Sequence, residues 1–173
     1  MRAPTERVPG AEAPLIDSHL LRRALGRFAT GVTIVTCVDA EGEQTGLTAN
    51  SFNSLSMEPP LVLWSLRLDS ANLLAFSQAR HFAVNVLAEG QLELSRRFAS
   101  RVKHRFTEGE WTLGDHGAPV LAGCTAVLEC ETTAQHDAGD HRLFIGRVRA
   151  CSEAALAPLV YRSGHYHQLG GHL

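Results

Sequence analysis

The fold of this chain is decided by Val32-Thr-Ile-Val-Thr-Cys-Val38, Asp39-Ala-Glu-Gly-Glu43 and Thr45-Gly-Leu-Thr-Ala-Asn-Ser-Phe52, which follow one another along the sequence. β-Branched residues dominate the first segment, as is typical of a β-strand. The acidic middle segment contains a glycine and has the composition of a turn. We therefore expect two paired strands joined by a turn.

Before this hairpin, Asp17 and Ser18 offer side chains that can cap a helix. Apolar residues then recur at helical spacing from Leu20 to Phe28, with three arginines mostly off this stripe, which predicts an amphipathic helix ending near Thr30. After the hairpin, the patterns predict strands over 61–66, 81–87, 124–136 and 141–151, helices over 70–79 and 89–99, and a loop over 107–119.

Many strands with a few short helices, and no regular alternation of the two, favour a mainly β fold. The arrangement indicates a β-barrel rather than a parallel doubly wound sheet. Residues 1–16 hold three prolines and a glycine, so we expect a flexible N-terminal arm followed by one domain over 17–173.

The charge balance excludes a broad polyanion-binding surface. The chain has 173 residues, of which 16 are Lys or Arg and 18 are Asp or Glu, so its formal net charge is -2. The distribution is uneven, because residues 96–105 contain five of the basic residues and no acidic one. This run is either a solvated face or a local anion site.

Nothing in the first 19 residues resembles the apolar core of a secretory signal, and no apolar stretch approaches the roughly 20 residues that span a bilayer. We therefore expect a cytoplasmic protein. The four cysteines, Cys37, Cys124, Cys130 and Cys151, match no CxxC pair and no zinc-binding spacing, so we expect small core residues in place of disulfides or ligands.

Local motifs for several chemistries are missing from the sequence. There is no Gly-x-Ser-x-Gly elbow, no P-loop and no Gly-x-Gly-x-x-Gly, and neither His165 with His167 nor Asp115 with His116 has the spacing of a helical zinc motif, so no metal is expected. Hydroxyls, backbone amides and arginines can also hold a phosphate. The segment Thr48–Ser56 is rich in such groups and is either a polar loop or a phosphate-binding site. Ser70 is likewise either a helix cap or part of a phosphate-binding site.

Five motifs in order carry a family resemblance that extends from about Leu20 to Leu169. They are Phe28-Ala-Thr-Gly-Val-Thr-Ile-Val-Thr36, Gly46-Leu-Thr-Ala-Asn-Ser-Phe52, Ser54-Leu-Ser56 with Pro59-Pro-Leu61, Phe82-Ala-Val-Asn-Val-Leu87, and Gly139-Asp-His141 before Phe144-Ile-Gly-Arg-Val148. The chain resembles the flavin reductase family, and more closely the short NAD(P)H:flavin reductase components of two-component flavin-dependent monooxygenases.

The resemblance implies an FMN-binding split β-barrel of Greek-key type and a homodimer. It places Thr48 to Phe52 along the flavin and Ser65 to Ser70 along its ribityl and phosphate end. The basic segment around and after Phe98, especially Arg97, Lys103 and Arg105, would then neutralise the flavin phosphate. His141 matches a histidine associated with nicotinamide binding. The implied cofactor-binding residues are Thr48, Ala49, Asn50, Ser51, Phe52, Ser54, Leu55, Ser65, Ser70, Arg97, Phe98, Lys103, Arg105, His141 and Tyr166.

The resemblance also implies the reaction, which is hydride transfer from NADH or NADPH to FMN or FAD. The reduced flavin then diffuses to a separate monooxygenase component. Because the two cofactors carry the reacting electrons, the protein needs no nucleophile. Two alternatives stay open, namely a flavin-binding electron-relay or sensor module without fast nicotinamide turnover, and an enzyme that keeps its flavin for an organic substrate. His141 favours the reductase, because a pure binding module needs no nicotinamide-binding histidine.

Overall fold

The computed structural model describes residues 16–100, 102 and 105–171. The predicted arm over 1–16 therefore lies outside the described residues except for Ile16. The helices are α1 (Ser18–Leu25), α2 (Leu73–Gln78), the 3-10 turn η1 (Glu89–Gln91) and α3 (Leu92–Ala99). The strands are β1 (Thr30–Gly31), β2 (Thr33–Val38), β3 (Gln44–Ala49), β4 (Asn53–Met57), β5 (Pro60–Arg67), β6 (His81–Val86), β7 (Trp111–Leu113), β8 (Pro119–Leu121), β9 (Ala126–Ala138), β10 (His141–Glu153), β11 (Val160–Arg162) and β12 (His165–His167).

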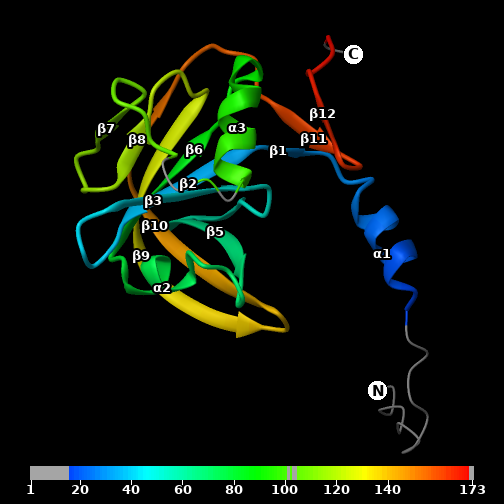
Figure 1. The fold of residues 1–173 in the computed structure, drawn as a ribbon, viewed down its shortest axis with the longest axis horizontal. Coiled ribbons are helices and arrows are strands. Elements are labelled where there is room, and N and C mark those ends of the chain that lie inside the picture. The colour runs from blue at the N-terminus through cyan, green and yellow to red at the C-terminus, as the bar shows by residue number, and fades with distance from the viewer. Residues whose placement is uncertain (1–15, 101, 103–104, 172–173) are drawn as a thin grey trace, which may run out of the picture.

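Seven strands form one antiparallel sheet in the order β3-β2-β6-β9-β10-β5-β4. Its two edge strands, β3 and β4, are consecutive in sequence and are joined only by residues 50–52. This short connection keeps the end of β3 near the start of β4, so the sheet is curled (Figure 1), and no ladder joins its two edges. This is the split barrel that the sequence predicts.

Two apolar clusters stabilise the barrel. The first fills its interior, where the Trp64 ring stacks on Phe144 at 4.6 Å between centroids and meets the edge of Phe76 at 4.9 Å. The second lies under α3 and contains Phe98 with residues of β2, β8 and β9. Alternation in β5 accounts for this packing, because Val62, Trp64 and Leu66 are buried while the residues between them face outward.

Most of the predicted elements are confirmed, with shifted ends. The α1 helix ends at Leu25, about five residues before the predicted end, and the predicted 70–79 helix begins at Leu73. The sequence missed β4 within the polar segment, as well as the short strands β1, β11 and β12. The predicted loop over 107–119 was wrong in part, since β7 lies inside it and pairs with β8.

The cysteines behave largely as predicted. Cys37, Cys124 and Cys130 are buried, and burial raises their pKa values to about 12, 11 and 12 respectively. Cys151 is exposed, so the expectation of a core residue was wrong there. No helix within the described ranges is both long and apolar enough to cross a membrane.

Candidate functional site

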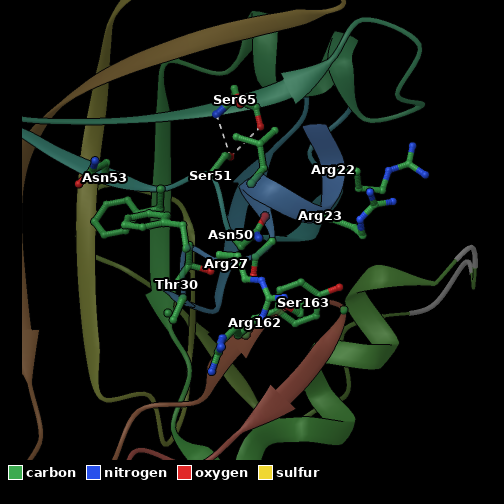
Figure 2. Close-up of a pocket in the computed structure, with 18 of the residues that line it drawn as sticks. Arg22, Arg23, Arg27, Thr30, Asn50, Ser51, Asn53, Ser65, Arg162 and Ser163 are labelled. Carbon is green, nitrogen blue, oxygen red and sulfur yellow. Dashed lines mark hydrogen bonds between the residues drawn. The ribbon is translucent and has the colours of Figure 1, made fainter. Parts of the chain in front are cut away.

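A cavity of about 1430 Å³ opens between α1 and the outer face of the barrel. Figure 2 shows its labelled lining residues, which come from α1, the segment after it, residues 50–53, β5 and the β11–β12 turn. The full lining is His19, Arg22, Arg23, Leu25, Gly26, Arg27, Phe28, Ala29, Thr30, Gly31, Asn50, Ser51, Phe52, Asn53, Leu63, Ser65, Tyr161, Arg162, Ser163 and Gly164.

The polar segment between β3 and β4 forms the inner wall of this cavity. The Ser51 hydroxyl donates a hydrogen bond to the Ser65 carbonyl and accepts one from the Ser65 amide, each at 3.0 Å. The β4–β5 ladder ends at Asn53 and Leu63, so Ser51 satisfies β5 backbone groups that have no partner strand at this point. Of the predicted flavin-lining residues, Asn50, Ser51, Phe52 and Ser65 meet in the cavity.

The flanking residues of the predicted segment do not line the cavity. Ala49 is buried, and its carbonyl accepts a hydrogen bond from the Thr33 hydroxyl at 2.8 Å. Ser54 and Leu55 lie on β4 at a break in its register with β5. Ser70, at the far end of the predicted run, accepts a hydrogen bond from the Asn72 amide at 3.3 Å, directly before α2.

A second group of predicted residues gathers round α3 and lies outside the cavity lining. The Thr48 hydroxyl donates to the Ser95 carbonyl at 2.7 Å, and the Tyr166 hydroxyl lies 2.9 Å from the Ser95 hydroxyl. Phe98 packs so closely on β3 that a Cβ on Gly46 would lie 2.8 Å from its ring. Thr48 and Ala49 face opposite sides of the strand. For this reason Thr48 contacts Ser95 of α3, whereas Ala49 is buried in the cluster that fills the barrel.

The basic segment makes internal contacts. Arg97 pairs with Glu110, with a second guanidinium nitrogen 3.1 Å from the other carboxylate oxygen. This hydrogen bond raises the pKa of Arg97 and lowers the pKa of Glu110. Arg105 donates to the carbonyls of Gly46 and Ser100, both at 2.8 Å. Neither arginine lines the cavity, and Lys103 lies outside the described residues.

His141 occupies the same outer face as the cavity. In the β5–β10 ladder, Leu143 is opposite Ser65 and His141 is opposite Arg67, so the alternation that buries Phe144 turns His141 outward with Leu143. The His141 Nδ1 lies 2.7 Å from the Asp140 carboxylate, and this contact lowers the pKa of Asp140. The imidazole is 41% exposed and accessible to a ligand.

The sequence analysis missed four cavity residues that carry positive charge: Arg22, Arg23, Arg27 and Arg162. The first three were visible only as residues off the apolar stripe of the first helix. Arg162 gave no local sign at all. Over the described ranges, no group of three or more His, Cys, Asp or Glu side chains could hold a metal ion.

Comparison with known proteins identifies the family. Residues 25–170 match the flavin reductase like domain. The chain is 44% identical over 159 residues to FMN reductase (NADH) SmoA of Agrobacterium fabrum, covering 92% of this chain and 88% of that protein. It is 42% identical to the reductase component of a flavin-dependent trigonelline monooxygenase of Acinetobacter baylyi, covering 84% of this chain but only 47% of that protein, so it spans about half of that relative.

A solved structure is also similar. NADH:FAD oxidoreductase SgcE6 of Streptomyces globisporus, in complex with NAD and FAD fragments, superposes with a TM-score of 0.84 at 37% identity, covering 91% of this chain and 98% of that one. The match of fold and sequence extends over almost the whole described chain, including the strands that build the cavity. The chain therefore belongs to the flavin reductase-like domain family.

Proposed function

We propose that this protein reduces FMN or FAD with NADH and passes the reduced flavin to a separate monooxygenase component. The observation that carries the proposal is the shared outer face of β5 and β10, on which cavity residue Ser65 and the exposed His141 lie two register positions apart. Hydride transfer requires two cofactor rings in contact, and one continuous surface can hold both. The relatives named as an FMN reductase (NADH) and an NADH:FAD oxidoreductase support the same activity.

The residues of the cavity fit a flavin. Asn50, Ser51 and Ser65 supply donors and acceptors for the polar edge of a ring, and Phe52 and Leu63 supply apolar surface beside them. The cavity lining has no acidic side chain among the described residues, so nothing there opposes a phosphate. When bound, the flavin supplies the hydride acceptor, and no protein nucleophile is needed.

The protein's own contribution is to bind and orient. Backbone amides and side-chain groups of residues 50–52, which line the cavity, would stabilise negative charge that develops on the reduced ring. His141 would position the dihydronicotinamide by stacking or by a hydrogen bond to its amide, and it donates no proton to the hydride step. Asp140 would hold the imidazole in orientation through its 2.7 Å contact.

We also propose that residues 17–173 act as one domain within a homodimer. Helix α1 has no buried residue. Its last residue, Leu25, is 66% exposed, and Phe28, three residues further on, is 75% exposed. Exposed apolar side chains in a row mark an interaction surface. A second copy of this chain is the partner that the family resemblance implies.

Steady-state turnover tests the activity. NADH oxidation is followed at the nicotinamide absorbance band with no flavin, with FMN and with FAD. A rate that rises with added flavin until saturation, with free reduced flavin as product, is the expected result. Stoichiometric tight flavin without NADH oxidation would instead establish a binding or relay module. Turnover that needs an organic substrate would establish an enzyme that keeps its flavin.

A further inference from the structure

Helix α1 contributes its basic residues and one apolar residue, Leu25, to the cavity lining. His19, Arg22 and Arg23 line the cavity, whereas Leu20, Leu21 and Ala24 do not. A surface helix ordinarily packs its apolar stripe on the domain and leaves its charges to solvent. In this chain every basic residue of α1 lines the cavity, so positive charge is concentrated along this side of it.

Two further arginines complete this charge. Arg27 follows α1 and Arg162 ends β11, and both line the cavity. Figure 2 shows Arg27 beside Asn50. We call Arg22, Arg23, Arg27 and Arg162 the arginine cluster. The hydroxyl and the amide of Ser163 both donate to the Gly26 carbonyl, each at 2.9 Å, which fixes the β11–β12 turn against the end of α1.

The arginine cluster lacks the carboxylate partners that other arginines of this protein have. Its guanidinium groups make no hydrogen bond or ion pair with any described residue. Elsewhere, six arginines pair with carboxylates, namely Arg67, Arg80, Arg96, Arg97, Arg142 and Arg149. Like charges that share one cavity repel each other unless an anion enters.

We propose that the arginine cluster binds the phosphate groups of a nucleotide whose ring lies at the polar segment. This inference rests on the proposed function for the identity of the nucleotide. Guanidinium groups bind phosphate oxygens in bidentate pairs, and they keep their charge at every physiological pH. A volume of about 1430 Å³ exceeds the roughly 300 to 1,000 Å³ of a pocket for one small ligand, so the cavity can hold a dinucleotide or parts of two nucleotides.

The phosphate can belong to the flavin or to the nicotinamide cofactor, and ligand series separate these sources. Riboflavin, FMN and FAD share one ring, and only the last two carry phosphate. NADH carries an adenosine monophosphate group that reduced nicotinamide mononucleotide lacks. The variants are Arg27→Gln with Arg162→Gln, and Arg22→Gln with Arg23→Gln. Arg80→Gln is the control, because it removes an exposed charge outside the cavity and leaves Glu131 paired with Arg149.

If the flavin phosphate is the ligand, fluorescence titration should show that each double variant binds FMN and FAD about tenfold more weakly or worse. The dissociation constant of riboflavin should be unchanged. If the nicotinamide cofactor is the ligand, the dissociation constants of all three flavins should equal those of wild type. The KM for NADH should then rise about tenfold more than the KM for reduced nicotinamide mononucleotide. The corresponding Arg→Lys variants keep the charge but lose the bidentate geometry of the guanidinium group. Their affinity for the ligand should lie between that of wild type and that of the Arg→Gln variants.

The proposal is overturned if both series change no more than in Arg80→Gln while circular dichroism shows the variants folded. Failure of the proposed function is a separate result. In that case wild-type protein oxidises no NADH with any flavin, and the titration of FMN against riboflavin still decides whether the arginine cluster binds phosphate.

Discussion

Ser51 and Ser65 are joined by two hydrogen bonds of 3.0 Å, in which one hydroxyl both donates to and accepts from the backbone of β5. The contact spans the split of the barrel at the point where the β4–β5 ladder has ended. A single side chain thereby substitutes for a missing strand and fixes the polar segment that lines the cavity.

Ser51→Ala removes both hydrogen bonds and leaves a half-buried amide and carbonyl of Ser65 without their partner. We expect the free energy of unfolding to fall by about 1 to 2 kcal/mol, measured by urea denaturation. Flavin affinity should fall as well, because residues 50–53 lose their attachment to β5. Ser51→Thr keeps the hydroxyl and is the matched control. Equal stability of the alanine variant and wild type would contradict the bridging role.

His141→Ala should raise the KM for NADH about tenfold while changing the KM for flavin little, since the imidazole lies beyond the flavin-lining residues on the β5–β10 face. Steady-state kinetics with each substrate varied in turn measures the difference. Equal effects on both constants would refute the assignment of His141 to the nicotinamide.

Asp140→Asn should produce a weaker form of the same defect, about fivefold in the KM for NADH, because it removes the charge that orients the imidazole. The double variant with His141→Ala should be no worse than His141→Ala alone, since Asp140 acts through the histidine. Additive losses would show that Asp140 contacts the substrate independently.

The Arg97–Glu110 pair predicts a pH-dependent stability. The pKa of Glu110 is held below its ordinary value by the Arg97 hydrogen bond, so the folded state binds its proton less readily than the unfolded state. The stabilisation is therefore present above the unfolded pKa of about 4.3 and is lost as the pH falls through the lower folded value. In thermal melts, the melting temperature of wild type should exceed that of Glu110→Gln at neutral pH. The two melting temperatures should converge below about pH 4.

The same pair tests the predicted cofactor role of the basic segment. Arg97→Gln should lower stability at neutral pH, and titration with FMN and riboflavin shows whether it also weakens phosphate binding. Glu93→Gln, which breaks the exposed Arg96 pair, is the control and should change stability little.

Phe28→Asp should convert the proposed dimer to monomer, because it places a charge in the exposed apolar surface formed by α1 and the segment directly after it. Light scattering after size-exclusion chromatography measures the mass. Leu74→Asp introduces the same charge at a residue of α2 with 67% exposure and should leave the mass unchanged. A dimer that survives Phe28→Asp, or a wild-type monomer, would remove α1 as the interface.

Local pattern was sufficient for six of the seven strands of the barrel sheet, and it missed only β4 among them. The β-branched run of β2 and the turn at Asp39 depend on neighbours in sequence, and the structure confirms both. The strand β9 is also confirmed, but burial along it does not alternate as predicted, because Val127 is buried as well as Cys130. The polar segment with Ser51 was also found in this way, because its composition departs from that of the strands around it. The short strands β11 and β12 escaped detection, since three residues carry too little periodicity to predict a strand.

The sequence by itself determined the antiparallel barrel, the polar segment and the family motifs, because each depends on residue type at short spacing. Only the tertiary structure decided which charges are neutralised. Arg97 finds its carboxylate on a separate loop, whereas Arg27 and Arg162, from opposite ends of the chain, line one cavity and contact no acidic residue among those described. Charge pairing depends on distance in space, and hydrophobic periodicity records only which face of an element is buried.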